Sequence, residues 1–140
     1  MQICVFEGIY YEKLEPLIFS RPAYDLVCGI NTLREKILRA YPEVKYSLHC
    51  RSYLTSLLRL QNHGIEINSI EDDECLFING NILAPPDLSE IIPLKDKGDK
   101  LFFSGDSFVA ISRLIFSTSD RICSAPCTIL EQYFFIFGGS

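Results

Sequence analysis

Residues 2–8 have the sequence Gln-Ile-Cys-Val-Phe-Glu-Gly, a short apolar run that stops at Gly8. A continuous apolar run of this kind is typical of a strand that is covered on both faces of a sheet. A second such run, Cys-Leu-Phe-Ile at residues 75–78, ends at Asn79-Gly80-Asn81. We therefore predict two buried strands, and we expect residues 2–6 to form the first and central one.

Helical and strand patterns alternate along the rest of the chain. Thr32 and Glu35 have the spacing of a capping box, and we expect Asp87 to cap a later helix. On the first of these helices we expect one face to carry Ile30, Leu33, Ile37 and Tyr41. The predicted helices lie at about 31–41, 52–62 and 87–92, the further strands at 44–49 and 65–69, and a hairpin at 101–111. This alternation predicts a three-layer α/β domain with a mostly parallel sheet.

Length and composition restrict the class of protein. The 140 residues suffice for one domain with a buried core. A hydrophobic content of 48% is too high for a disordered chain, and no uninterrupted apolar run is long enough to span a bilayer. The formal net charge of -5 argues against a nucleic-acid-binding protein. We therefore expect any phosphate to be met locally, by a few cations or by backbone N–H groups.

The cysteines do not form a recognisable framework. They are scattered, no Cys-x-x-Cys occurs, and both histidines lie far from the one close pair, so free buried thiols are favoured over disulfides or a zinc site. The N-terminus has no basic segment typical of a signal peptide, so we expect a cytoplasmic protein. The six cysteines are Cys4, Cys28, Cys50, Cys75, Cys123 and Cys127.

Residues 9–29 contain two prolines and no helical periodicity, so we predict a long ordered loop after the first strand. Loops of this length are usually functional, and ligands of α/β sheets bind beyond the carboxyl ends of the strands. Arg21 could grip a diphosphate in a bidentate manner, and Lys36 could neutralise charge on a phosphoryl group. In the alternative, Arg21 pairs with Asp25 to brace the loop. Arg34 and Lys36 are then solvated helix charges, and the spacing alone favours this alternative.

Residues 19–36 resemble the signature of the N-terminal domain of sugar nucleotidyltransferase-like proteins. The group that they resemble most is the bifunctional UDP-N-acetylglucosamine diphosphorylase and glucosamine-1-phosphate N-acetyltransferase family. Two further blocks, residues 76–85 and 105–110, are similar to a strand segment and the following hairpin of that family. The blocks occur in order and cover roughly residues 2–115. The shared positions of the first block are Arg21-Pro22, Asp25, Gly29 and Thr32-x-Arg-Glu-Lys36.

The resemblance implies a nucleotidyltransferase-like, Rossmann-like fold. It also implies nucleotidyl transfer from a nucleoside triphosphate to a sugar 1-phosphate, with release of pyrophosphate and assistance from Mg²⁺. On this basis we predict that Arg21 and Lys36 are catalytic cations. The predicted substrate-binding residues are Gly8, Asp25, Gly29, Asn79, Gly80 and Asn81. The expected partners are the two substrates, with no nucleic acid and no membrane.

Two departures from the family pattern favour a different function. Gly8 is followed by Ile9-Tyr10-Tyr11, without the glycine pair of the loop in the broader superfamily. Asn81 stands where superfamily members usually have a metal-binding aspartate, and an amide is a poor ligand for Mg²⁺. The metal ligands therefore stay unassigned, and Asn79-Gly80-Asn81 could be no more than a tight turn. The alternative function is a non-catalytic sugar-nucleotide-binding or assembly module attached to an acyltransferase domain.

The end of the chain bears on domain organisation. The apolar run Tyr-Phe-Phe-Ile-Phe at residues 133–137 is followed only by Gly-Gly-Ser. We expect residues 1–140 to be the N-terminal part of a truncated domain. By resemblance, the remainder and a left-handed β-helix domain would follow and carry the contacts of a homo-oligomer. We also expect the 140-residue chain to self-associate through this run.

Overall fold

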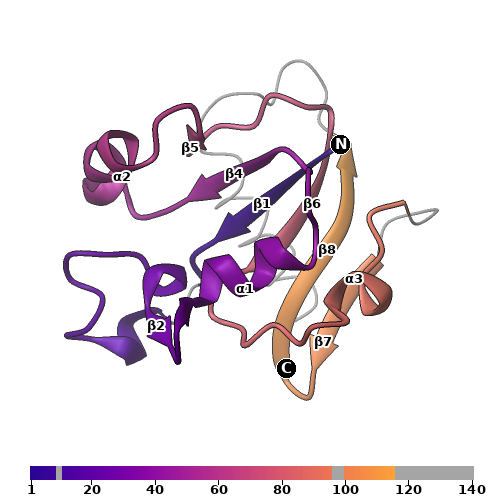
Figure 1. Cartoon of the computed structure of the whole chain (residues 1–140), viewed down its shortest axis with the longest axis horizontal. Helices are drawn as coiled ribbons and strands as arrows, with labels where there is room; N and C mark the ends of the chain where they lie inside the picture. The colour runs from indigo at the N-terminus through magenta and orange to yellow at the C-terminus, as the bar shows by residue number, and fades with distance from the viewer. Residues whose placement is uncertain (9–10, 96–99, 116–140) are drawn as a thin grey trace.

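A six-stranded sheet dominates the structure, a computed structural model that describes residues 1–8, 11–95 and 100–115, with the backbone alone for 112–115. The strand order is β5-β4-β1-β6-β8-β7 (Figure 1). The neighbours β5, β4, β1 and β6 are parallel, whereas β8 is antiparallel to both β6 and β7. The α/β class, the mostly parallel sheet and the central first strand are confirmed. The strands are β1 (Gln2–Phe6), β4 (Tyr46–His49), β5 (Glu66–Ile67), β6 (Glu74–Asn79), β7 (Lys100–Ser104) and β8 (Ser107–Ile115).

The register of the parallel strands brings three loops to one edge of the sheet. Phe6, the last residue of β1, pairs with His49 at the end of β4 and with Asn79 at the end of β6. The backbone N–H of Gly80 continues this pattern by donating to the carbonyl of Phe6 over 2.8 Å. The segments that follow β1, β4 and β6 therefore begin side by side at this carboxyl edge.

In the described ranges, the helices α1, α2 and α3 pack on one face of the sheet (Figure 1). Each contributes a buried residue, namely Ile37, Leu58 or Leu88, to a cluster that also contains Ile3 and Val5 of β1. Alternate residues of a strand point to opposite faces, so the same strand presents a different set to the other side. The helices are α1 (Leu33–Arg39), α2 (Thr55–Gln61) and α3 (Leu88–Ile91).

The opposite face has its own apolar cluster. Cys4 and Phe6 pack there with Cys75 and Phe77 of β6 and with Ile111 of β8. Within residues 1–8, 11–95 and 100–115, no helix contributes to this cluster. The predicted third layer is therefore not tested by the described residues, and neither are the predictions for residues 133–137, Cys123 and Cys127.

Local rules account for the start of α1. The Thr32 hydroxyl accepts a hydrogen bond from the Glu35 N–H over 3.2 Å, and the Glu35 carboxylate accepts one from the Thr32 N–H over 2.8 Å. The capping box is thus confirmed, and the hydrogen bond from the Thr32 backbone lowers the pKa of Glu35. Ile37 and Tyr41 are buried as predicted, but Ile30 is 97% exposed because it precedes the helix in a turn.

The cap expected for the last helix is absent. The Asp87 side chain makes no capping hydrogen bond, because its backbone (φ -94°, ψ 18°) is not the extended one of a side-chain cap. Its carbonyl accepts from the Glu90 N–H instead.

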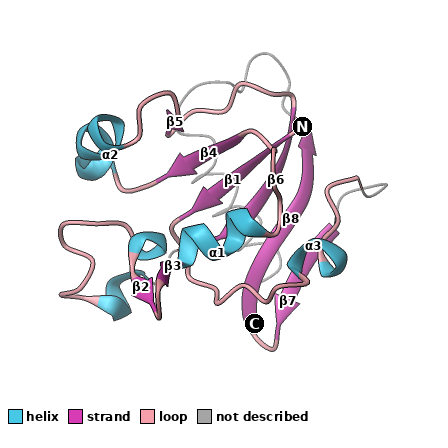
Figure 2. Cartoon of the chain, in the orientation of Figure 1, coloured by secondary structure: helices cyan, strands magenta, loops and turns pink. Residues whose placement is uncertain are grey.

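The predicted long loop contains short ordered elements (Figure 2). Gly29, with φ +81°, makes the turn between two strands that pair apart from the main sheet. Gly105, with φ +61°, makes the predicted turn between β7 and β8. The short elements are the 3-10 helices η1 (Tyr11–Leu14), η2 (Ala23–Asp25) and, before α2, η3 (Ser52–Leu54), and the strands β2 (Val27–Cys28) and β3 (Asn31–Thr32).

The cysteines of the described residues are all free. Cys4, Cys50 and Cys75 are buried, as predicted, whereas Cys28 is exposed on β2. Among the helices in these parts of the chain, none combines the length and the apolar character needed to cross a membrane.

Candidate functional site

Glu7 is the first residue after β1 and lies buried at the carboxyl edge. Its Oε1 accepts a hydrogen bond from the backbone N–H of Ala23 over 3.0 Å. Its Oε2 lies 3.0 Å from Nε of Arg51, and the Glu7 side chain is only 2% exposed. One carboxylate thus joins the end of β1 to the long loop and to the segment after β4.

Arg51 follows β4 by two residues and completes this connection. Its Nη2 donates to the backbone carbonyls of Ile18 and Arg21, the latter over 3.0 Å. Its guanidinium lies over two tyrosine rings, 4.8 Å from the centre of Tyr11 and 5.0 Å from that of Tyr53. Arg51 is not among the residues predicted from the sequence. Its position just beyond a predicted strand end was the available signal.

Arg21 is exposed, and its backbone is fixed at this edge by the bond from Arg51. In the described part of the chain its guanidinium has no hydrogen bond or ion pair in the structure. Lys36 is half-buried on α1, which packs against η2, and its ammonium likewise has no such partner there. These two predicted cations therefore remain available to an anionic ligand.

Asp25 and Arg34 have a supporting role. Arg34 Nε lies 2.9 Å from Asp25 Oδ1, and its Nη1 donates to the Asn62 side chain over 2.9 Å. Burial raises the pKa of Asp25, and the Arg34 charge opposes that rise. Asp25 forms its ion pair with Arg34 and not with Arg21, whose charge also lowers the pKa of Asp25, and Arg34 is not a solvated helix charge. Arg34 braces the long loop through its ion pair with Asp25.

The turn after β6 uses its polar groups internally. Asn79 Nδ2 donates to the carbonyl of Phe108 over 3.0 Å, and its Oδ1 accepts from the Asn81 N–H over 3.0 Å. The structure thus shows the tight turn that sequence alone could explain. A ligand contact by Asn79 stays a prediction, and it would have to use the amide's remaining capacity.

Two glycines allow the edge to pack closely. A Cβ at Gly80 would lie 2.6 Å from Cβ of Tyr24, and one at Gly8 would lie 3.1 Å from Oδ1 of Asn79. Tyr24 is fully buried, and burial raises the pKa of its hydroxyl far above the ordinary value. These contacts place Gly8 beside Asn79 and Gly80 beside Tyr24, and a role of the two glycines and Asn79 in substrate binding stays a prediction. Gly29 is exposed with open space around it, and the β2–β3 turn alone accounts for it.

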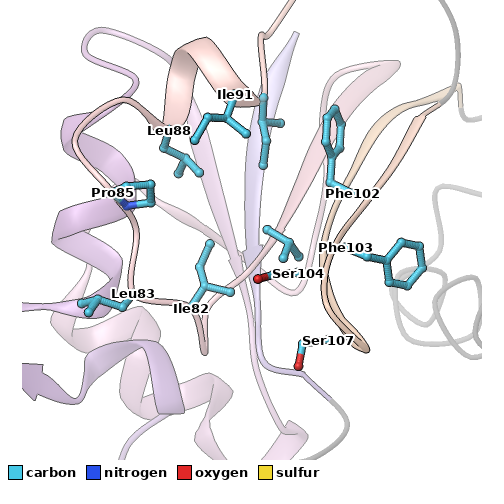
Figure 3. A pocket seen from close by; sticks show the side chains of 11 residues that line it. Ile82, Leu83, Pro85, Leu88, Ile91, Phe102, Phe103, Ser104 and Ser107 are labelled. Atoms are coloured by element: carbon cyan, nitrogen blue, oxygen red, sulfur yellow. The ribbon is translucent and has the colours of Figure 1, made fainter.

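A pocket of about 470 Å³ opens beside this turn, between α3 and the β7–β8 hairpin (Figure 3). Its lining contains no charged side chain and begins directly after Asn81. Phe102 points toward α3, whereas Phe103 points away from it (Figure 3). Size and apolar lining suit the uncharged part of a small molecule. The lining residues are Ile82, Leu83, Pro85, Leu88, Ile91, Ile92, Phe102, Phe103, Ser104, Ser107 and Val109.

The described residues of the edge do not form a magnesium site of their own. Among the described residues there is no group of three or more His, Cys, Asp or Glu that could hold a metal ion. Glu7 and Asp25 already face arginines, while the buried Oδ1 of Asn81 has no hydrogen-bond partner. A single amide oxygen is a weak ligand for a hard cation, so these residues do not fit a protein-held Mg²⁺.

A family model described as sugar nucleotidyl transferase matches residues 3–120. The chain belongs to the sugar nucleotidyl transferase family. No curated protein and no solved structure matches the chain. The match to the sugar nucleotidyl transferase model includes the loop, the turn after β6 and the pocket, so the family is assigned on the same residues that form the candidate site.

Proposed function

We propose that the chain transfers a nucleotidyl group from a nucleoside triphosphate to a sugar 1-phosphate. An oxygen of the sugar 1-phosphate attacks the α-phosphorus, and the bond to the β-phosphate oxygen breaks. The products are pyrophosphate and a nucleotide sugar of the UDP-N-acetylglucosamine type. The observation that carries this proposal is Arg21, an exposed arginine whose backbone is held at the carboxyl edge while its guanidinium stays available.

Phosphoryl chemistry of this kind depends mainly on alignment and charge neutralisation. Arg21 can contact two phosphate oxygens at once, and Lys36 can add a point charge. The pocket after β6 has no charged lining and is proposed to take the sugar. This arrangement would place the reacting phosphates between the cations and the pocket.

We propose Mg²⁺ as the cofactor, delivered with the triphosphate. Mg²⁺ is commonly bound through substrate phosphates with few protein carboxylates. The described residues contain no group of three or more His, Cys, Asp or Glu that could hold it. No role of a particular side chain is assigned to it.

A second function is favoured by one observation. Both carboxylates nearest the edge, those of Glu7 and Asp25, face arginines of the chain itself. A module that only binds a nucleotide sugar, or that assembles with an acyltransferase domain, would not need a carboxylate for metal binding.

The test is release of pyrophosphate by the chain. A panel of nucleoside triphosphates and sugar 1-phosphates is incubated with Mg²⁺, and each substrate alone is the control. Release that requires one triphosphate together with one sugar 1-phosphate supports the transferase. If no pair gives release above background while a nucleotide sugar binds in calorimetry, the binding module is supported and the transferase is wrong.

A further inference from the structure

The backbone at Arg51 is fixed from two sides. The N–H of Cys50 donates to Oδ1 of Asn68 over 2.8 Å, and the N–H of Arg51 donates to Oε2 of Glu7 over 3.4 Å. Asn68 adopts φ +56° and also donates to the Thr55 hydroxyl over 2.7 Å. The segment after β4 is therefore a rigid base from which the Arg51 side chain extends.

The donors of the Arg51 side chain are engaged by Glu7, by Tyr53 and by the long loop. The side chain contacts Glu7 through Nε, Tyr53 through Nη1 and two loop carbonyls through Nη2. Tyr53 extends the connection by donating to the carbonyl of Phe19 over 3.3 Å. With 10% of its side chain exposed and its donors engaged, Arg51 has little capacity left for a substrate.

We propose that Arg51 is a positioning residue of the candidate site, acting through Arg21. By holding the carbonyls of Ile18 and Arg21, it fixes the backbone from which the Arg21 guanidinium reaches an anionic ligand. This inference rests on the proposed function in one respect, the binding of phosphate by Arg21. Under this proposal, the affinity of Arg21 for an anion depends on Arg51, whose side chain does not touch the anion.

The substitution Arg51→Lys keeps the positive charge and changes the geometry of the side chain. Its single ammonium can stay beside Glu7, but it lacks the planar fork that reaches two carbonyls and stacks between aromatic rings. Arg51→Lys therefore keeps the buried charge pair and loosens the loop. Arg59→Gln is the matched control, since Arg59 is an exposed arginine on α2.

The first readout needs no ligand. Amide hydrogen exchange is measured for residues 11–26 in the full chain. Arg51→Lys should exchange at least roughly tenfold faster than wild type there, with β1 and β6 unchanged, because loops open locally when their few anchors are lost. Arg59→Gln should match wild type. Equal protection of residues 11–26 in Arg51→Lys and wild type would overturn the proposal.

The second readout is a double-mutant cycle on the affinity for inorganic pyrophosphate, measured by calorimetry. Arg51→Lys should weaken binding roughly tenfold in the wild-type background and less than about twofold in the Arg21→Ala background, because coupled residues are not additive. Equal losses in both backgrounds would mean that the two arginines act independently, and no binding by wild type would remove the anion site; either result overturns the proposal. Pyrophosphate binding with the expected coupling but without nucleotidyl transfer would contradict only the proposed function.

Discussion

The two halves of the carboxyl edge are built from different chemistry. After β1 and β4 the chain places charged side chains, with Glu7 bound to Arg51 and Asp25 bound to Arg34. After β6, and along the β7–β8 hairpin, it places an amide turn and an apolar pocket without a charged lining residue. Both halves belong to one sheet and meet where Phe6 pairs with Asn79.

This difference shows how a chain with a net charge of -5 can offer a local site for phosphate. Glu7 and Asp25 are paired with Arg51 and Arg34, which leaves the cations Arg21 and Lys36 for a ligand. The second half offers contact area without charge. A substrate with a charged end and an uncharged end would fit across the two.

The largest expected effect comes from removing the available cation of the charged half. Arg21→Ala should lower turnover by roughly 10²–10³, the range for loss of one preorganised donor to a transition state. Arg21→Lys should restore only part of it, because an ammonium cannot form the bidentate contact. Steady-state pyrophosphate release measures both. Arg59→Ala, which removes an exposed arginine on α2, should leave turnover unchanged. Full activity of Arg21→Ala would exclude Arg21 from catalysis.

The next largest effect is expected where the halves touch. Gly80→Ala brings a Cβ to 2.6 Å from Cβ of Tyr24, a contact that requires a backbone shift. We expect the free energy of unfolding to fall by about 1–3 kcal/mol, as for other overpacked cores. Chemical denaturation measures it. Asn81→Ala, the neighbouring control, should change stability and turnover little, since its Oδ1 has no hydrogen-bond partner. Unchanged stability of Gly80→Ala would mean that loop and turn are not packed as described.

A charge introduced into the apolar half tests the proposed sugar pocket. Leu83 is 63% exposed at the pocket, so Leu83→Lys should fold normally. We expect KM for the sugar 1-phosphate to rise roughly tenfold while KM for the triphosphate changes little, because the lysine must be desolvated or displaced. Leu60→Lys on α2, where Leu60 is 71% exposed, is the control. A rise confined to the triphosphate KM would assign the pocket to the nucleotide instead.

The smallest expected effect is a difference in reactivity at Cys50, the residue that precedes Arg51 in the charged half. Burial raises the pKa of Cys50 to about 11, whereas Cys28 lies exposed on β2. The thiolate is the reactive form, so near pH 8 an alkylating reagent should modify Cys28 and spare Cys50. Labelling of Cys50 should grow as the pH approaches its pKa in the folded chain. Mass-spectrometric mapping of the modified peptides separates the two sites, and equal labelling near pH 8 would contradict the burial of Cys50.

Local patterns in the sequence were enough for much of the fold. The apolar runs gave β1 and β6, and the spacing of Thr32 and Glu35 gave the start of α1, because these signals depend on neighbours along the chain. The exposed Ile30 and the missing Asp87 cap show the limit of the same rules at helix ends.

The partners of the charged half could not be predicted in this way. Glu7 and Arg51 are 44 residues apart in the sequence and meet only because β1 and β4 are adjacent and parallel. Likewise, Arg34 on α1 reaches Asp25 through the packing of α1 on η2. The sequence shows that several cations lie in this region. Only the tertiary structure shows which of them form ion pairs within the fold and which remain available to a ligand.

The division of the edge into a charged and an uncharged half can be tested by backbone amide NMR. The chain is titrated separately with inorganic triphosphate and with the neutral sugar N-acetylglucosamine. We expect the triphosphate to shift the amides of residues 7–8 and 19–26, and the sugar to shift those of residues 80–91 and 102–109. Shifts from the triphosphate concentrated at residues 80–91 and 102–109, or from the sugar at residues 19–26, would contradict this division.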